Sequence, residues 1–241
     1  MAQKPTRRDF LRWFGTGAAL AVSGFGYGDV DSNAIEVVRK DIVLPKWDAD
    51  GFKVAAVADL HVVTPQAVQR AKRAFELAIA EKPDVLVIVG DFVDKSPDYV
   101  LHYIGQALEP LHEAKCPVLA VMGNHDYWAQ QPTRVIQAIR EAPVRLLRNE
   151  WLDIQGVGVM GLDDAIAHRH RPDALLDEGL PRSMLCLLHE PDFVEDIPKQ
   201  ASLQISGHSH GGQICLPMGI SVHTPYGALK YISGYYPDAR V

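Results

Sequence analysis

Residues 85–94 read Val85-Leu86-Val87-Ile88-Val89-Gly90-Asp91-Phe92-Val93-Asp94. Five aliphatic residues in a row, closed by a glycine, predict a β-strand. Because the run is unbroken instead of alternating with polar residues, both faces of this strand are expected to be covered. Two carboxylates follow directly, so the functional groups are expected at the carboxyl end of the strand.

The same pattern recurs along the chain, where apolar strand-like runs alternate with helical patterns. Strands are predicted at Ile35–Leu44, Val54–Ala58, Val85–Val89, Val118–Met122, Val144–Leu147, Val157–Met160, Met184–Leu188 and Leu203–Ile205. Helices are predicted at Gln66–Glu81, Asp98–Ala114 and Thr133–Glu141. This alternation indicates an α/β protein, and hairpin-like segments at Trp151–Gly161 and Gln213–Tyr226 indicate a mixed sheet.

Composition fits one globular domain that is not specialised for nucleic acid. The 241 residues are 47% hydrophobic and 22% charged, which is enough apolar material for a sizeable core. The net charge is −6, and a basic excess of +3 within residues 1–12 leaves −9 on the remainder. A generic nucleic-acid binder needs a basic face, so a nucleic-acid partner is not expected.

The three cysteines are widely spaced and odd in number. Cys116, Cys186 and Cys215 form no CxxC pair, so neither a disulfide framework nor a thiolate zinc site is indicated. Cys116 and Cys186 are expected to be buried as small apolar residues.

The N-terminus resembles a twin-arginine export signal. Arg7 and Arg8 precede Phe10 and Leu11, and an uncharged, Gly- and Ala-rich stretch follows over 13–28. We therefore expect a signal or anchor at 1–28 and a single domain at 29–241, exported through the twin-arginine translocase to the periplasm or the outer face of the cytoplasmic membrane. Cleavage near Ala21-Val22-Ser23 and retention as an anchor both stay open, as does a frayed basic N-terminus on a cytoplasmic enzyme.

Five predicted strands run into short clusters of coordinating side chains. These clusters are Asp59-Leu60-His61, Asp91 to Asp94, Gly123-Asn124-His125-Asp126, His189, and Gly207-His208-Ser209-His210-Gly211-Gly212. The carboxyl ends of strands in an open α/β sheet form the ligand crevice, so these groups are expected to converge. Each cluster alone is a weak signal. Imidazole and carboxylate groups with one amide and no thiolate suit Mn, Fe, Zn or Co, and a carboxylate can bridge two such ions.

Taken in order, the clusters resemble the motifs of the calcineurin-like metallophosphoesterase family, from about Lys53 to His210. This resemblance implies two mixed β-sheets packed face to face and flanked by helices. It also implies one divalent metal ion on Asp59, His61 and His210, a second on Asn124, His189 and His208, and Asp91 as the bridge. His125 would act on the scissile group without binding metal. Asp94 would orient His125, although a purely structural Asp94 stays open.

The implied activity is hydrolysis of a phosphodiester, phosphomonoester or pyrophosphate by a metal-bound hydroxide. Phosphoprotein phosphatases of this superfamily have arginine where Lys95 stands and glutamate where Asp126 stands, so a protein phosphatase is not expected. A metal-binding scaffold without turnover, and a nuclease or cyclic-nucleotide phosphodiesterase, remain alternatives.

The leader and the Gly207 to Gln213 motif resemble the bacterial membrane-associated phosphodiesterases, near the UDP-2,3-diacylglucosamine diphosphatases of lipid A synthesis. A lipid-linked or UDP-sugar substrate and a membrane surface are therefore expected partners. The apolar residues that would face them are Leu229, Tyr231, Ile232, Tyr235 and Tyr236, unless these form a terminal β-hairpin.

One loop between predicted strands is a candidate for contact with the substrate. It holds Asp163-Asp164 and the basic run from His168 to Arg171, in which Arg169 or Arg171 would hold a second phosphate. A solvated surface run is the alternative. Relatives usually continue beyond the segment equivalent to Tyr235–Val241, so a truncated C-terminus and a complete one both stay open.

Overall fold

The computed structural model describes residues 35–94, 101–175, 180–212, 215–216, 220–221 and 223–239. The chain divides into two compact units, Met1–Val38 and Arg39–Val241, and the second contains every helix and strand described below. The predicted export signal at 1–28, Lys95 and Gln213 lie outside the described residues. Within the described ranges, no helix combines the length and the apolar character that crossing a membrane requires.

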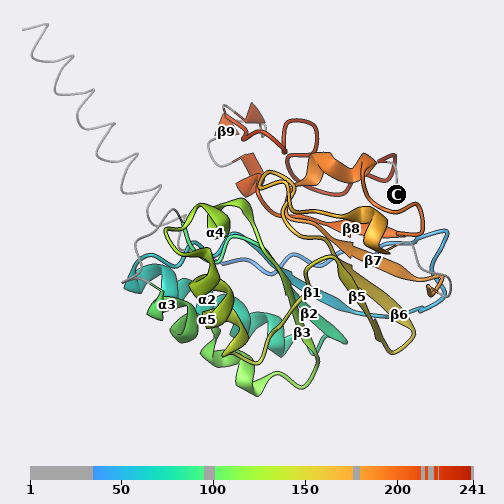
Figure 1. The fold of residues 1–241 in the computed structure, drawn as a ribbon. Helices are drawn as coiled ribbons and strands as arrows, with labels where there is room; N and C mark the ends of the chain where they lie inside the picture. The colour runs from blue at the N-terminus through green and yellow to red at the C-terminus, as the bar shows by residue number, and fades with distance from the viewer. Residues whose placement is uncertain are drawn as a thin grey trace, which may run out of the picture. The chain divides into compact units, whose positions relative to one another are not determined.

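The first sheet has four strands in the order β1-β2-β3-β4. Its strands are β1 (Val54–Val57), β2 (Val85–Val89), β3 (Val118–Val121) and β4 (Arg145–Leu146), and all three pairings are parallel. The helices between these strands are α2 (Pro65–Ala80), α3 (His102–Leu108) and α5 (Pro132–Arg140), and they lie on one side of the sheet (Figure 1). Parallel strands need such crossover connections.

The second sheet has the order β5-β6-β7-β8 and is mixed. Strands β5 (Glu150–Ile154) and β6 (Val157–Gly161) form an antiparallel hairpin, whereas β7 (Met184–Leu187) and β8 (Leu203–Ile205) continue in parallel. Gln155 and Gly156 turn the hairpin with φ of 57° and 86°, the left-handed backbone that a two-residue turn of this kind requires. A separate antiparallel pair joins β9 (Cys215–Leu216) to β10 (Ile220–Ser221).

The two sheets pack face to face because successive strand residues point to opposite faces. Val85, Val87 and Val89 of β2 share a buried cluster with Leu185 and Leu187 of β7. The alternate residues of β2 pack instead against the helices. The outer face of the second sheet is covered by the 3₁₀ helices η3 (Pro172–Leu175) and η4 (Pro191–Glu195). The predicted two-sheet sandwich with flanking helices is thus confirmed, with the mixed pairing located in the second sheet.

Two of the predicted elements differ from the structure. The predicted strand Ile35–Leu44 is wrong, since this segment forms no strand and leaves Val43 93% exposed. Its charged centre gives it too little apolar surface to bury. The helix predicted at Asp98–Ala114 is α3 followed by the 3₁₀ helix η2 (Glu109–Glu113), and 98–100 lie outside the described residues. Pro110 lacks the amide that an α-helix needs there.

The C-terminal segment and one of the cysteines also differ from the prediction. Residues 223–239 contain no strand, so the expected terminal β-hairpin of aromatic residues is wrong. Asp192 instead binds this segment through the backbone amides of Leu229, Lys230 and Tyr231. Cys186 is a free, buried cysteine as predicted, whereas the free Cys116 is only half-buried.

Candidate metal centre

The structure brings the five coordinating clusters together at the carboxyl ends of strands from both sheets. Asp59 and His61 follow β1, and Asp91 follows β2. Asn124 begins α4 (Asn124–Trp128) shortly after β3. His189 follows β7, and His208 and His210 follow β8. Three groups of side chains have ligand-capable atoms within 4.8 Å of one another. These groups are Asp59, His61, Asp91 and His210; Asp91, His189 and His208; and His61, Asp94 and His125.

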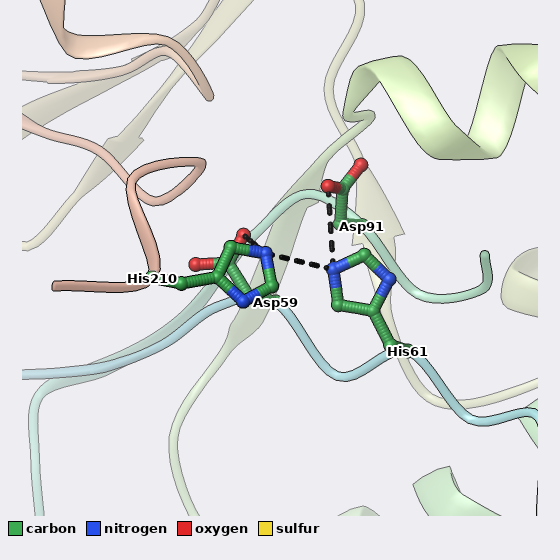
Figure 2. A group of neighbouring side chains, drawn as sticks. All are labelled: Asp59, His61, Asp91 and His210. Atoms are coloured by element: carbon green, nitrogen blue, oxygen red, sulfur yellow. Dashed lines mark hydrogen bonds and ion pairs between the residues drawn. The ribbon is translucent and has the colours of Figure 1, made fainter. Parts of the chain in front are cut away.

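Figure 2 shows the first group, in which two imidazoles and two carboxylates from three different loops face one another. The Nε2 atom of His61 lies 3.1 Å from Nε2 of His210 and 3.5 Å from Oδ2 of Asp91. Nε2 of His210 lies 4.0 Å from Oδ1 of Asp59. Nitrogen and carboxylate oxygen atoms that converge in this way are the usual ligands of zinc and similar divalent ions.

The second group is centred on His189, which is completely buried. Its Nδ1 donates to the carbonyl of Val89 over 2.8 Å, which leaves Nε2 facing Asp91 Oδ2 at 3.1 Å. Nε2 of His208 donates to the carbonyl of Tyr226 over 2.9 Å, so Nδ1 is the nitrogen left for a ligand. Hydrogen bonds of this kind fix the tautomer and the ring orientation of metal-binding histidines.

Buried polar atoms test whether these residues fit a metal ion. Oδ2 of Asp91, Nε2 of His189 and both side-chain polar atoms of Asn124 are buried without a hydrogen-bond partner among the described residues. Asp91 Oδ2 and His189 Nε2 lie close together but without the geometry of a hydrogen bond. Unsatisfied polar atoms are costly inside a protein, so such a cluster needs another partner. A divalent cation fits this donor set.

The backbone around the site is strained. In the described chain, Asp59, His61, Asp91, His208 and His210 all have left-handed φ values, between 43° and 66°. Each such residue costs on the order of 1 kcal/mol, and non-glycine residues of this type cluster at functional sites. Gly123 permits the close approach, since a Cβ there would lie 2.3 Å from Oδ1 of Asp91.

The charges of the buried groups depend on one another. Burial alone would raise the pKa of Asp91, but His189 and His61 hold it well below its ordinary value. Burial alone would lower the pKa of His189, but Asp91 and Asp59 raise it well above the usual range. Burial lowers the pKa of His61 and of His208, which favours the neutral, coordinating form of both rings.

His125 lies at the edge of this site. Its Nδ1 lies 2.5 Å from Oδ1 of Asp94, and its ring is 5.0 Å from that of His61, edge to face. Its backbone amide donates to Oδ1 of Asp91 over 2.9 Å. The ring of Trp128, one helical turn along α4, lies 5.0 Å away. The structure therefore places His125 and Asp94 together beside the candidate ligands.

Two buried acids support the site and were not predicted to do so. Asp126 accepts hydrogen bonds from the amides of Val93 and Gly123, and so connects the loops that carry Asp91 and Asn124. Glu190 accepts from the amides of Ala165 and Ile166 directly after His189. In the sequence, only the position of Asp126 and Glu190 next to coordinating residues indicates this supporting role.

The loop that the sequence offers for contact with the substrate begins at Asp163 and Asp164, and both of these side chains are buried. Asp163 accepts hydrogen bonds from the Tyr127 hydroxyl at 2.5 Å and from Arg148 at 2.9 Å. These partners are distant in sequence, so the pairing could not be predicted. Within the same loop, Arg169 and Arg171 are exposed.

A sandwich of two sheets whose strand ends gather carboxylates and imidazoles around buried, unsatisfied donors is the architecture of a metal-dependent phosphoesterase. The family model for calcineurin-like phosphoesterases matches residues 52–212, and the chain belongs to this family.

Three relatives illustrate the similarity. The chain is 29% identical to phosphodiesterase YaeI of Escherichia coli, over 95% of this chain and 86% of the relative. It is 31% identical to the metallophosphoesterase YkuE of Bacillus subtilis, over 97% of this chain and 87% of the relative. It is 25% identical to the UDP-2,3-diacylglucosamine pyrophosphatase LpxG of Chlamydia trachomatis, over 78% of this chain and 73% of the relative.

Proposed function

We propose that the chain hydrolyses a phosphodiester or a diphosphate with two divalent metal ions. Asp59, His61 and His210 would hold one ion, and Asn124, His189 and His208 the other. One observation carries this proposal: Oδ2 of Asp91 lies 3.5 Å from Nε2 of His61 and 3.1 Å from Nε2 of His189. A single carboxylate oxygen therefore faces both ligand groups, as a bridge between two ions requires.

The side chains of this site would divide the catalytic tasks. When bound, the two ions would activate a water molecule for attack on phosphorus and neutralise charge on the phosphoryl group. Asp94 holds Nδ1 of His125, so Nε2 of His125 is available to donate a proton to the leaving oxygen. The ring of Trp128 lies beside that of His125 at 5.0 Å, with an angle of 54° between the ring planes.

A lipid-linked or nucleotide-sugar substrate is the class we favour. The residues that line a hollow of about 340 Å³ include Asp59, Gly207, Tyr231, Tyr235 and Tyr236. Leu229 nearby in sequence is 58% exposed. Apolar surface next to the candidate centre would suit an acyl chain or a base, and LpxG is named for a substrate that carries both.

Metal analysis together with an activity assay tests the proposal. Purified protein loaded with Mn²⁺ or Zn²⁺ should bind about two ions per chain and hydrolyse bis-p-nitrophenyl phosphate, and a chelator should abolish turnover. Asp91→Asn should lose both bound ions and at least ~10³-fold in kcat, whereas exposed Asp50→Asn should lose neither. One ion per chain, or full activity in Asp91→Asn, would refute the dinuclear site.

We also propose export by the twin-arginine route, on the strength of Arg7, Arg8 and the uncharged stretch that follows them. The protein would then act in the periplasm or on the outer face of the cytoplasmic membrane. Cell fractionation should recover the protein outside the cytoplasm, and changing both arginines to lysine should retain it inside. An unchanged distribution of that variant would exclude this route.

A further inference from the structure

A second polar hollow of about 370 Å³ lies outside the candidate metal centre. Its lining includes Arg148, Asn149, Asp163, His168, Arg169 and Arg171. This volume lies within the range of ~300–1,000 Å³ that small-molecule sites occupy. The three arginines against one aspartate give it a local positive charge in a chain with a net charge of −6.

Asn149 organises the wall of this hollow. Its side-chain oxygen accepts from the amides of Asp163 and Arg171, at 3.1 and 2.8 Å, and its side-chain nitrogen donates to the carbonyl of Arg169 at 3.0 Å. One asparagine thus holds both ends of the loop 163–171. The arginines of this loop are presented from a backbone that is hydrogen-bonded in place.

The arginines differ in how they are engaged. Arg148 is paired with Asp163 at 2.9 Å, and the guanidinium of Arg169 lies 4.8 Å above the ring of Tyr127. Neither Arg169 nor Arg171 forms an ion pair with a carboxylate of the described residues. A guanidinium that is positioned but not neutralised is well suited to bind phosphate or carboxylate.

The hollow and the candidate metal centre lie at the same edge of the sandwich. Arg148 and Asn149 follow β4, which is parallel to β3, and the loop 163–171 follows β6, which is parallel to β7. Both sites also contact α4, through His125 on one flank and Tyr127 on the other. The width of α4 separates the two sites, and a helix is ~10 Å across with its side chains. Extended arginine side chains shorten the distance that a bound molecule must span. A sugar-sized spacer would therefore join groups bound in the two sites.

We infer that this arginine hollow binds a second anionic group of the substrate, distinct from the phosphate that is cleaved. The inference rests on the proposed function, and it adds that good substrates carry two anionic groups joined by a sugar-sized spacer. Arg169 and Arg171 would contact the second group directly. Arg148 would complete the positive field while it remains paired with Asp163.

Two chromogenic substrates test this inference. The first is p-nitrophenyl thymidine 5′-phosphate, and the second is the same ester with an added 3′-phosphate. The metal-loaded protein should show a kcat/KM at least ~10-fold higher for the second, since hydrogen bonds to charged groups are worth ~1.5–3 kcal/mol. Arg171→Gln and Arg169→Gln should each reduce this ratio towards 1. The control Arg145→Gln, an exposed arginine paired with Glu150, should leave the ratio unchanged.

The outcomes separate the two proposals. A ratio below 2 in the metal-loaded wild-type protein, with normal turnover of the first substrate, would overturn the second subsite. A high ratio that persists in Arg169→Gln/Arg171→Gln would overturn it too, because the added phosphate would then be bound elsewhere. Thermal unfolding of each variant shows that it is folded. The absence of metal-dependent turnover with either substrate would contradict the proposed function itself.

Discussion

Nδ1 of His125 lies 2.5 Å from Oδ1 of Asp94, three residues beyond Asp91 on the loop that follows β2. The same loop thus presents one carboxylate to the candidate metal centre and another to the histidine beside it. Because the amide of His125 also donates to Asp91, the position of this histidine is tied to both acids. This arrangement separates the residues that would bind metal from those that would act on the leaving group.

Asp94→Asn is the first prediction. The asparagine keeps the size of the side chain but removes the charge that holds His125, so we expect kcat to fall ~10–100-fold while the bound metal is retained. Steady-state kinetics with metal analysis measures both. Asp196→Asn is the control, since Asp196 lies 3.5 Å from His170 outside the centre, and its kcat should not change. Loss of metal from Asp94→Asn would instead make Asp94 a ligand.

Removal of metal should lower the stability of the protein. Asp91 Oδ2, His189 Nε2 and the Asn124 amide are buried without partners in the described chain, and a bound ion would satisfy them. An ion at 100 times its Kd stabilises the folded state by about 2.7 kcal/mol. We expect a chelator to lower Tm by roughly 5–10 °C for a chain of this size, measured by calorimetry. An unchanged Tm after verified metal removal would mean that these atoms do not bind it.

The convergence of the candidate ligands could be predicted from the sequence, because the clusters follow apolar strands and parallel strand ends share one edge. The left-handed backbone at Asp59, Asp91 and His208 could not be predicted from the sequence, because such φ values are rare for residues other than glycine. Nor could the contact between His208 and the carbonyl of Tyr226, which depends on how the C-terminal segment folds back.

The errors in the fold have similar causes. The apolar, β-branched residues of Ile35–Leu44 predicted a strand. A strand also needs a partner strand, and the local sequence does not show whether one is present. The helix predicted at Asp98–Ala114 took no account of Pro110, and the structure has a 3₁₀ helix there. The burial of Asp163 depends on Tyr127 and Arg148, which lie in other elements. Side chains whose partners are distant in sequence are the part that patterns miss.

Gly123→Ala should impair the candidate centre through sterics alone. A Cβ at this position would lie 2.3 Å from Oδ1 and 2.5 Å from the backbone nitrogen of Asp91, so Asp91 must move. We expect weaker metal binding, measured by titration calorimetry, and a loss of ~1–3 kcal/mol in the free energy of unfolding.

Gly105→Ala is the matched control for this substitution. Nothing lies within 4 Å of a Cβ at Gly105, which lies inside α3. Alanine there should stabilise the protein by ~0.5–1 kcal/mol without changing metal affinity. Equal metal affinities in the two variants would show that the space beside Asp91 is not limiting.

Asp164 should make the stability depend on pH. Burial and the neighbouring Glu190 raise the pKa of Asp164 to about 9 in the folded protein, from an ordinary value of 3.8. Between these values the folded state holds a proton that the unfolded state has released. The free energy of unfolding should therefore fall as the pH rises through this window, by at most ~1.4 kcal/mol per pH unit from this group.

Asp164→Asn tests that dependence, because the amide resembles the protonated acid. Its oxygen can still accept from the amide of Ala167, and its nitrogen can donate to Glu190. We expect the variant to lose less stability than the wild type between pH 5 and pH 8, as followed by urea unfolding. The advantage of the variant should thus be larger at pH 8 than at pH 5. If the free energy of unfolding changed with pH in the same way in both proteins, Asp164 would ionise normally. The folded loop beside His189 would then retain no extra proton.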